Sequence, residues 1–177
     1  MMNNVVRAAW ANAVINKEFI CIRTCSGYRS CRVDPKGVMH LLAPDASDQV
    51  LGEAVLDALS QSRFVLGAPR TDVWIHPEAT FDKELYNLEA TMQRYKDWIS
   101  QMMTRYGYKT KRALFKEMKN CNIVSEEGQM TLRPTHHEKL EAWSGTGLGG
   151  SDRVVIPANS PSKEVGAALR LAFSRCT

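Results

Sequence analysis

The sequence predicts a mixed α+β fold in which a largely antiparallel sheet packs against amphipathic helices. Two observations carry this prediction. Short β-rich runs bounded by turn residues occur toward both ends of the chain, and apolar residues recur at helical spacing between and after them. The length of 177 residues is typical of one domain, and 44% of the residues are hydrophobic, which is enough to bury a core without metals or disulfides. We therefore expect residues 1–177 to form a single domain.

The first part of the chain predicts a meander of antiparallel strands. Its apolar runs are rich in β-formers and are separated by residues with strong turn preference, at Ser26-Gly27 and at Asp34–Gly37. The predicted strands are Glu18–Thr24 and Val38–Leu42, with Val5–Trp10 as a possible further strand.

The first helix is predicted where six apolar residues form one stripe. These are Val50, Leu51, Ala54, Val55, Ala58 and Leu59. Ser47 and Asp48 precede the stripe and offer an N-terminal cap and a negative charge that suits the helix dipole. The opposite face carries Glu53 and Asp57, and two stacked carboxylates without a basic partner repel each other slightly. That small cost indicates that the face is kept acidic for a reason.

The middle of the chain predicts two short strands and a long helix. The strands are Arg63–Leu66 and Asp72–His76, the second ended by Pro77. The helix is predicted from Asp82 to Tyr106 and ends at Gly107. Apolar residues recur along this helix at helical spacing and form one stripe. Such a stripe can form a coiled-coil seam, but in a chain of this size we expect it to pack on the sheet. Its apolar positions are Leu85, Leu88, Met92, Tyr95, Ile99, Met102 and Tyr106.

A short helix and a hairpin are predicted next. Thr110 can cap a helix over Lys111–Lys119. The strands Cys121–Ser125 and Gln129–Arg133 flank a turn at Glu126–Gly128, and their apolar residues alternate with polar ones.

The chain ends with a loop, a strand and a helix. Ser144–Gly150 is glycine-rich and predicts a loop, and Arg153–Ile156 predicts the last strand. Ser160 is the expected N-cap of the final helix, with Pro161 at its first position. The expected buried face of this helix is Val165, Ala168, Leu169, Ala172 and Phe173.

Composition favours a cytoplasmic protein without a metal or cofactor. No apolar run approaches the roughly 20 residues that span a bilayer, and Arg7 interrupts the only apolar stretch near the N-terminus. The odd count of five cysteines fits reduced thiols. Cys21, Cys25 and Cys31 lack a second ligand pair at zinc-site spacing, and the adjacent His136 and His137 would point apart on a strand.

No residue pattern predicts catalysis. The sequence has no phosphate-binding loop, no GxSxG motif and no HExxH motif, and Gly145–Gly150 precedes a strand where a dinucleotide loop must follow one. His136-His137-Glu138 is the densest titratable cluster, and we interpret it as surface residues near a helix start. A cysteine nucleophile beside one of these histidines stays open as an alternative. We expect no enzymatic activity, no catalytic residue and no small-molecule substrate.

Charge is unevenly distributed along the chain, whose net charge is +4. Residues 41–90 hold three basic and nine acidic side chains, and residues 91–120 hold eight basic and two acidic ones. The basic stretch Arg94–Lys119 also contains aromatic residues, a combination that suits nucleic acid. Tyr95 and Tyr106 already belong to the helical stripe, however, so direct nucleic-acid binding is the weaker prediction.

Several segments, in this order and spacing, resemble the immunity proteins of bacterial contact-dependent growth inhibition systems. The resemblance is scattered from about residue 19 to the end of the chain. It is carried by Ser26–Tyr28, Arg32–Pro35, Leu51–Ser60, Ser62–Phe64, Tyr106–Lys109, Lys111–Phe115, His136–Trp143, Val155–Pro157 and Ala167–Ala172.

The resemblance implies a cytosolic inhibitor that binds one cognate toxin domain in a one-to-one complex. The toxin is expected to be a nuclease, and an RNase in particular, whose active site or substrate surface is blocked. Because a nuclease presents basic side chains to phosphate, we expect carboxylates of the acidic segment to contact it. The candidate partner-binding residues are Asp48, Glu53, Asp57, Asp72, Glu78 and Asp82. The alternative is a nucleic-acid-binding or regulatory protein that uses Arg94–Lys119.

Overall fold

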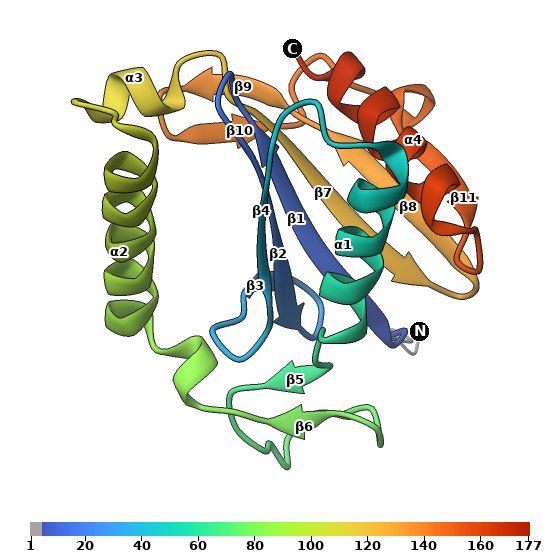
Figure 1. The fold of residues 1–177 in the computed structure, drawn as a ribbon. Helices are drawn as coiled ribbons and strands as arrows, with labels where there is room; N and C mark the ends of the chain where they lie inside the picture. The colour runs from blue at the N-terminus through green and yellow to red at the C-terminus, as the bar shows by residue number, and fades with distance from the viewer. Residues whose placement is uncertain (1–4) are drawn as a thin grey trace.

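The computed structural model describes residues 5–177, in which runs of consecutive strands are separated by helices (Figure 1). The strands are β1 (Ala8–Ile15), β2 (Ile20–Gly27), β3 (Cys31–Val33), β4 (Met39–Leu42), β5 (Val65–Leu66), β6 (Thr80–Phe81), β7 (Lys119–Glu126), β8 (Gln129–Pro134), β9 (His136–Lys139), β10 (Ala142–Ser144) and β11 (Val154–Pro157). The α-helices are α1 (Asp48–Ser60), α2 (Leu88–Tyr106), α3 (Lys111–Phe115) and α4 (Ser162–Arg175), and Glu84–Tyr86 (η1) and Gly150–Asp152 (η2) are 3-10 turns.

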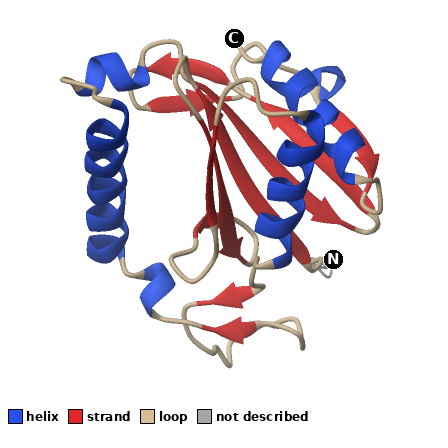
Figure 2. Ribbon diagram, viewed as in Figure 1, coloured by secondary structure: helices blue, strands red, loops and turns tan. Residues whose placement is uncertain are grey.

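One antiparallel sheet of seven strands organises the fold (Figure 2). Its order is β11-β8-β7-β1-β2-β3, and β4 also pairs with β2, at the opposite end of that strand from β3. β9 and β10 form a separate hairpin, and β5 and β6 form a short parallel pair. The predicted α+β class and the antiparallel meander are confirmed.

The first core lies between the sheet and the helices α1 and α4 (Figure 1). The predicted buried face of α4 is confirmed, and so is that of α1 except for Val50, which is exposed. The two helices touch through their backbones. A Cβ atom at Gly52 would lie 1.6 Å from the carbonyl oxygen of Ser162, and one at Gly166 would lie 1.8 Å from that of Asp48.

The second core, on the other side of the sheet, is smaller and involves α2 and α3. Trp98, Ile99 and Met102 of α2 pack with residues of β1, β2 and α3. The N-terminal half of α2 is not covered, because the side chains of Leu88 and Met92 are 72% and 53% exposed. The prediction that the whole apolar stripe packs on the sheet is therefore wrong for this half of the helix.

Two predicted elements between residues 63 and 106 are corrected. Asp72–His76 is irregular, and the strand that pairs with β5 is Thr80–Phe81 instead. β-forming composition did not suffice there, because no neighbouring strand covers the segment and Trp74 is 59% exposed. The long helix starts at Leu88, where the Asn87 side chain caps it by accepting from the backbone of Ala90.

Four boundaries are corrected elsewhere. The first strand is Ala8–Ile15 rather than Val5–Trp10. α3 ends at Phe115, because the chain turns and enters β7 at Lys119. His136–Glu138 lies in strand β9, so the expected helix start is wrong. Pro161, not Ser160, is the N-cap of α4.

The turn predicted at Ser26-Gly27 is wrong, because both residues pair with β3 inside strand β2 and the chain turns at residues 28–30. Other predicted turns and caps are confirmed. Ser47 and Thr110 cap α1 and α3, and Gly107 ends α2 in the left-handed conformation with φ of 71°. Glu127 and Gly128 both have positive φ, as a tight two-residue hairpin turn requires.

Candidate functional site

Three of the six predicted partner-binding carboxylates lie on α1. Asp48 pairs with Arg170 at 3.3 Å, and an oxygen of Asp57 lies 2.7 Å from a ring nitrogen of His40. Glu53 is exposed and makes no ion pair within residues 5–177. The helix therefore carries an acidic surface, but two of its three carboxylates already have a basic neighbour.

The other three carboxylates are distributed over the segment between β5 and η1. Asp72 pairs with Arg70, and Glu78 pairs with Arg7 at 2.7 Å, with all four side chains exposed. Asp82 is different, because its side chain is only 11% exposed. Glu53 and Asp57 thus lie one turn apart on α1, Asp48 lies at the N-terminal end of the helix against α4, and Asp72, Glu78 and Asp82 lie on a separate segment.

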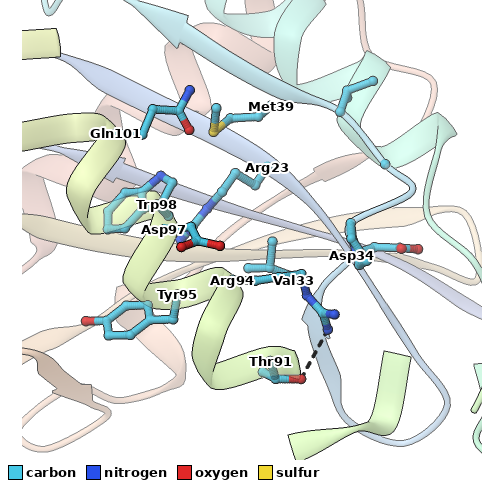
Figure 3. A pocket seen from close by; sticks show the side chains of 13 residues that line it. Arg23, Val33, Asp34, Met39, Thr91, Arg94, Tyr95, Asp97, Trp98 and Gln101 are labelled. Carbon is cyan, nitrogen blue, oxygen red and sulfur yellow. Dashed lines mark hydrogen bonds between the residues drawn. The ribbon is translucent and has the colours of Figure 1, made fainter. Parts of the chain in front are cut away.

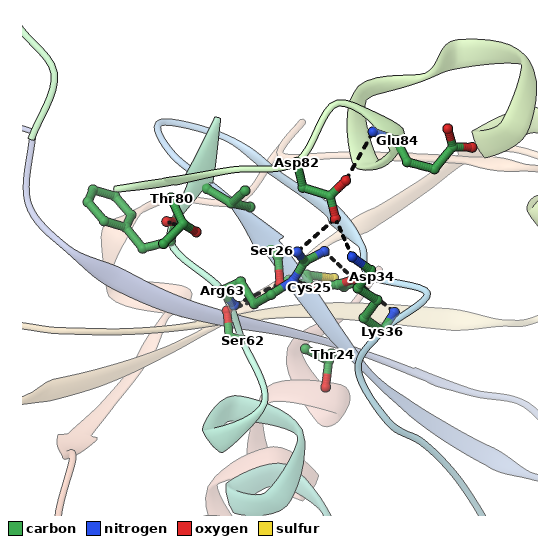
Figure 4. Close-up of polar contacts among 12 residues, drawn as sticks. Thr24, Cys25, Ser26, Asp34, Lys36, Ser62, Arg63, Thr80, Asp82 and Glu84 are labelled. Carbon is green, nitrogen blue, oxygen red and sulfur yellow. Dashed lines mark hydrogen bonds and ion pairs between the residues drawn. The ribbon is translucent and has the colours of Figure 1, made fainter. Parts of the chain in front are cut away.

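Asp82 belongs to a charge network centred on Arg63 (Figure 4). Arg63 donates two hydrogen bonds to the carboxylate of Asp34, at 2.7 and 2.9 Å, and one to Asp82 at 2.8 Å. Ser26 donates to Asp34 at 2.6 Å, and Lys36 pairs with Asp82 at 3.1 Å. The Asp34 side chain is 0% exposed. The network joins the β3–β4 connection to the segments before β5 and after β6.

Both carboxyl groups of this network are held in the charged form. Burial alone would raise the pKa of Asp34, but hydrogen bonds from Arg63 and Ser26 outweigh it and keep the pKa below its usual value. Hydrogen bonds from Arg63 and Lys36 hold the pKa of Asp82 well below its ordinary range. Sequence analysis missed Asp34, Lys36 and Arg63, because nothing in their spacing shows that they meet.

A cleft of about 440 Å³ lies between α2 and the open edge of the sheet (Figure 3). One wall is α2, and the other is the end of β3, the β3–β4 connection and the start of β4. Arg63 and its carboxylates anchor this second wall through Asp34. The lining residues are Arg23, Val33, Asp34, Pro35, Gly37, Val38, Met39, Thr91, Arg94, Tyr95, Asp97, Trp98 and Gln101.

The cleft combines apolar walls with two arginines. Val33, Met39 and Trp98 supply apolar surface, and Arg23 and Arg94 supply positive charge. In the part of the chain that the structure describes, β3 and β4 pair with β2 on one edge only. The other edge therefore leaves backbone donors and acceptors available to a partner.

Aromatic rings of the basic stretch Arg94–Lys119 pack against other rings of the protein. Tyr106 is stacked on Phe19 with ring centroids 4.6 Å apart, and Phe115 is buried. Of the basic residues in the stretch, Arg94 lines the cleft, while Lys111 lies 3.4 Å from Glu141 near the β9–β10 hairpin. Tyr95 is 38% exposed beside Arg94, but its ring stacks with Trp98 and its hydroxyl donates to Glu141. Because single-stranded nucleic acid needs free rings beside its cations, this geometry favours another kind of ligand.

The Cys25 and Cys31 thiols lie within hydrogen-bond reach of each other, but the thiols and histidines of the described residues form no metal site. Over residues 5–177 no three histidine, cysteine or acidic side chains are placed to hold a metal ion. Cys21, Cys25 and Cys121 are buried, and burial raises the pKa of Cys121 well above its usual value. No helix in this range combines the length and the apolar character needed to cross a membrane.

A mixed cleft beside an unpaired sheet edge is typical of a protein that recognises another macromolecule. The chain matches the CDI immunity protein family, CdiI, over residues 9–176, and it belongs to this family. It is 58% identical over 175 residues to the immunity protein CdiI-YPIII of Yersinia pseudotuberculosis serotype O:3, covering 99% of each chain.

Two solved structures are similar over nearly the whole chain. One comes from the CdiA-CT/CdiI toxin and immunity complex of Yersinia pseudotuberculosis, with a TM-score of 0.96 and 57% identity, covering 98% of this chain and 100% of that one. The other is a protein of unknown function, NMB0488, from Neisseria meningitidis, with a TM-score of 0.81 and 35% identity over 100% of both chains.

Proposed function

We propose that this protein binds one cognate toxin domain of a contact-dependent growth inhibition system in the cytosol and neutralises it. The toxin is a nuclease, most simply an RNase, and the protein does no chemistry of its own. The observation that carries the proposal is the 0.96 TM-score match to a chain from a solved toxin and immunity complex. Membership of the immunity family and the 58% identical immunity protein support it further.

We propose the α2–sheet cleft as the docking surface for the toxin. Its volume of about 440 Å³ accommodates several side chains of a partner, and its walls expose apolar residues that are costly to leave in water. The neighbouring edge strands offer backbone hydrogen bonds. Asp82 supports one wall of this cleft through Arg63 and does not itself need to touch the toxin.

A bulky residue in the cleft is expected to weaken toxin binding. Gln101 is exposed and lines the cleft, so Gln101→Trp fills the space without disturbing the core. We expect a loss of toxin affinity of at least about tenfold, because packing of the partner's anchor residues is blocked. Titration with the purified toxin domain, read by calorimetry and by RNA cleavage, measures it. Ser100→Trp, on the same helix but outside the cleft, is the matched control. Equal binding by both variants would remove the cleft from the interface, and no binding by the wild type would refute the function.

The acidic surface of α1 is proposed to attract a basic toxin over a distance, with Asp72 and Glu78 adding to the same field. Glu53→Lys combined with Asp57→Lys is expected to slow association, increasingly so at low salt, and to leave dissociation nearly unchanged. Stopped-flow binding at several ionic strengths measures this. An unchanged association rate in the folded double variant would show that α1 plays no part.

A further inference from the structure

Arg23 is a charged group of the cleft that has no counter-ion in the described part of the chain. It extends from β2, and its guanidinium lies 4.4 Å from the centre of the Trp98 ring. One terminal nitrogen donates to Asn12 at 3.0 Å, while Nε is buried without a hydrogen-bond partner. Within residues 5–177 no carboxylate forms an ion pair with Arg23.

The nearby carboxylates have other partners or stay apart. Asp34 lines the same cleft but is bonded to Arg63. Glu141 accepts from Tyr95 and Lys111. Asp97 also lines the cleft, and its carboxylate accepts from Gln93 at 2.9 Å. Arg23 is thus left as a cation without a counter-ion.

The second arginine of the cleft is also without a carboxylate. Arg94 of α2 donates to the Thr91 hydroxyl at 3.2 Å and forms no ion pair in the described part of the chain (Figure 3). Two guanidinium groups therefore line a space whose walls are otherwise largely apolar. A partly desolvated guanidinium is costly unless an anion completes its hydrogen bonds.

We propose that Arg23 is the specificity anchor of this cleft and receives a carboxylate of the toxin. The planar guanidinium suits a carboxylate, which can accept hydrogen bonds from its terminal nitrogens. Stacking on Trp98 holds the group in place before binding, which lowers the cost of ordering it. The apolar walls favour a protein segment over a phosphate chain. This inference rests on the proposed function and adds that toxin recognition in the cleft depends on an acidic residue of the toxin.

Arg23 is expected to matter little for the stability of the free protein. An arginine kept for a partner contributes little to folding, so its removal should weaken binding much more than stability. Arg23→Met keeps a long, unbranched side chain over Trp98 and is expected to leave Tm unchanged or higher. Its toxin Kd is expected to rise at least about 30-fold. Arg23→Lys keeps the charge but loses the planar fork, so it should also keep Tm and bind with intermediate affinity.

The experiment measures Tm and toxin Kd for these variants, with Arg112→Met as the control. Arg112 is exposed on α3 outside the cleft, and its variant should bind within about twofold of the wild type. Each acidic residue of the toxin is then replaced by alanine and tested against wild type and Arg23→Met. One of these toxin variants should bind the wild-type protein more weakly than the unmodified toxin does. The same variant should bind Arg23→Met as well as the unmodified toxin binds Arg23→Met.

Three results would overturn the inference while leaving the proposed function standing. These are wild-type affinity for Arg23→Met, additive losses for every acidic toxin residue, and displacement of the toxin by an RNA oligonucleotide that binds through Arg23. A lower Tm with unchanged Kd would assign Arg23 a purely structural role. If the wild-type protein fails to bind the toxin, the proposed function itself fails.

Discussion

Arg63→Ala is expected to destabilise the protein by about 3 kcal/mol, because it leaves a buried carboxylate without its cation. Arg63 donates two hydrogen bonds to Asp34, whose side chain is fully buried, and one to Asp82. Urea unfolding at pH 7 measures the loss. Arg70→Ala is the matched control, since Arg70 pairs with Asp72 in an exposed pair and should leave the midpoint nearly unchanged. Equal urea midpoints for the two variants would show that the Arg63 network does not stabilise the fold.

The same network makes stability depend on acid in a defined direction. The folded pKa values of Asp34 and Asp82 lie below their unfolded values of about 3.9. The contribution of Asp34 and Asp82 to the free energy of unfolding is therefore fully present above about pH 4, and it is lost as pH falls through their folded pKa values. Wild-type Tm should drop more steeply below pH 4 than the Tm of Asp34→Asn, which cannot titrate at this position.

Gly52→Ala is expected to destabilise the protein by about 3 kcal/mol, which corresponds to a fall in Tm of roughly 6–12 °C. In an exposed helix the same change would stabilise by about 1 kcal/mol, so the sign is diagnostic. The new methyl group would lie 1.6 Å from the Ser162 carbonyl oxygen, and α1 and α4 must move apart. Calorimetry measures Tm. Glu53→Ala, on the neighbouring exposed position, should change stability by less than about 0.5 kcal/mol.

Gly166→Ala tests the same contact from the opposite helix, because its methyl group would lie 1.8 Å from the Asp48 carbonyl oxygen. It should destabilise to a similar extent. A rise in Tm for both alanine variants would show that the helices separate at little cost.

The elements predicted well are those whose information is local. Ser47 and Thr110 accept hydrogen bonds from backbone groups three residues away, and Glu127-Gly128 closes a two-residue hairpin. Such bonds form within a single turn and leave a mark in consecutive residues. The buried stripe of α4 was equally predictable, because α1 and the sheet together cover that face of the helix.

The errors arose where a partner element was needed. Asp72–His76 has the composition of a strand but no strand beside it, whereas Thr80–Phe81 pairs with β5 despite its shorter run. Amphipathic spacing also marked Leu88 and Met92 as apolar positions without showing what covers them. Trp98, which is buried beside Arg23, falls outside the predicted stripe.

The acidic residues illustrate the same limit. The sequence shows a segment rich in carboxylates, but ion pairs are made across long separations in the chain. Asp48 meets Arg170, and Asp82 meets Arg63 and Lys36. The sequence therefore does not show which carboxylates are paired with a cation in the fold. Asp82, for example, pairs with Arg63 and supports one wall of the cleft.

The α+β class, the helix ends at Ser47, Gly107 and Thr110, the Glu127-Gly128 turn and the resemblance to the immunity family could all be predicted from the sequence. Each depends on short-range patterns or on ordered segments of the chain. The covered half of α2, the pairing of the charges and the position of the cleft became visible only in the folded chain. The cleft is built from β2, from residues 33–39 and from residues 91–101. Its shape and its uncompensated arginines depend on the packing of these distant segments, and no local pattern encodes that.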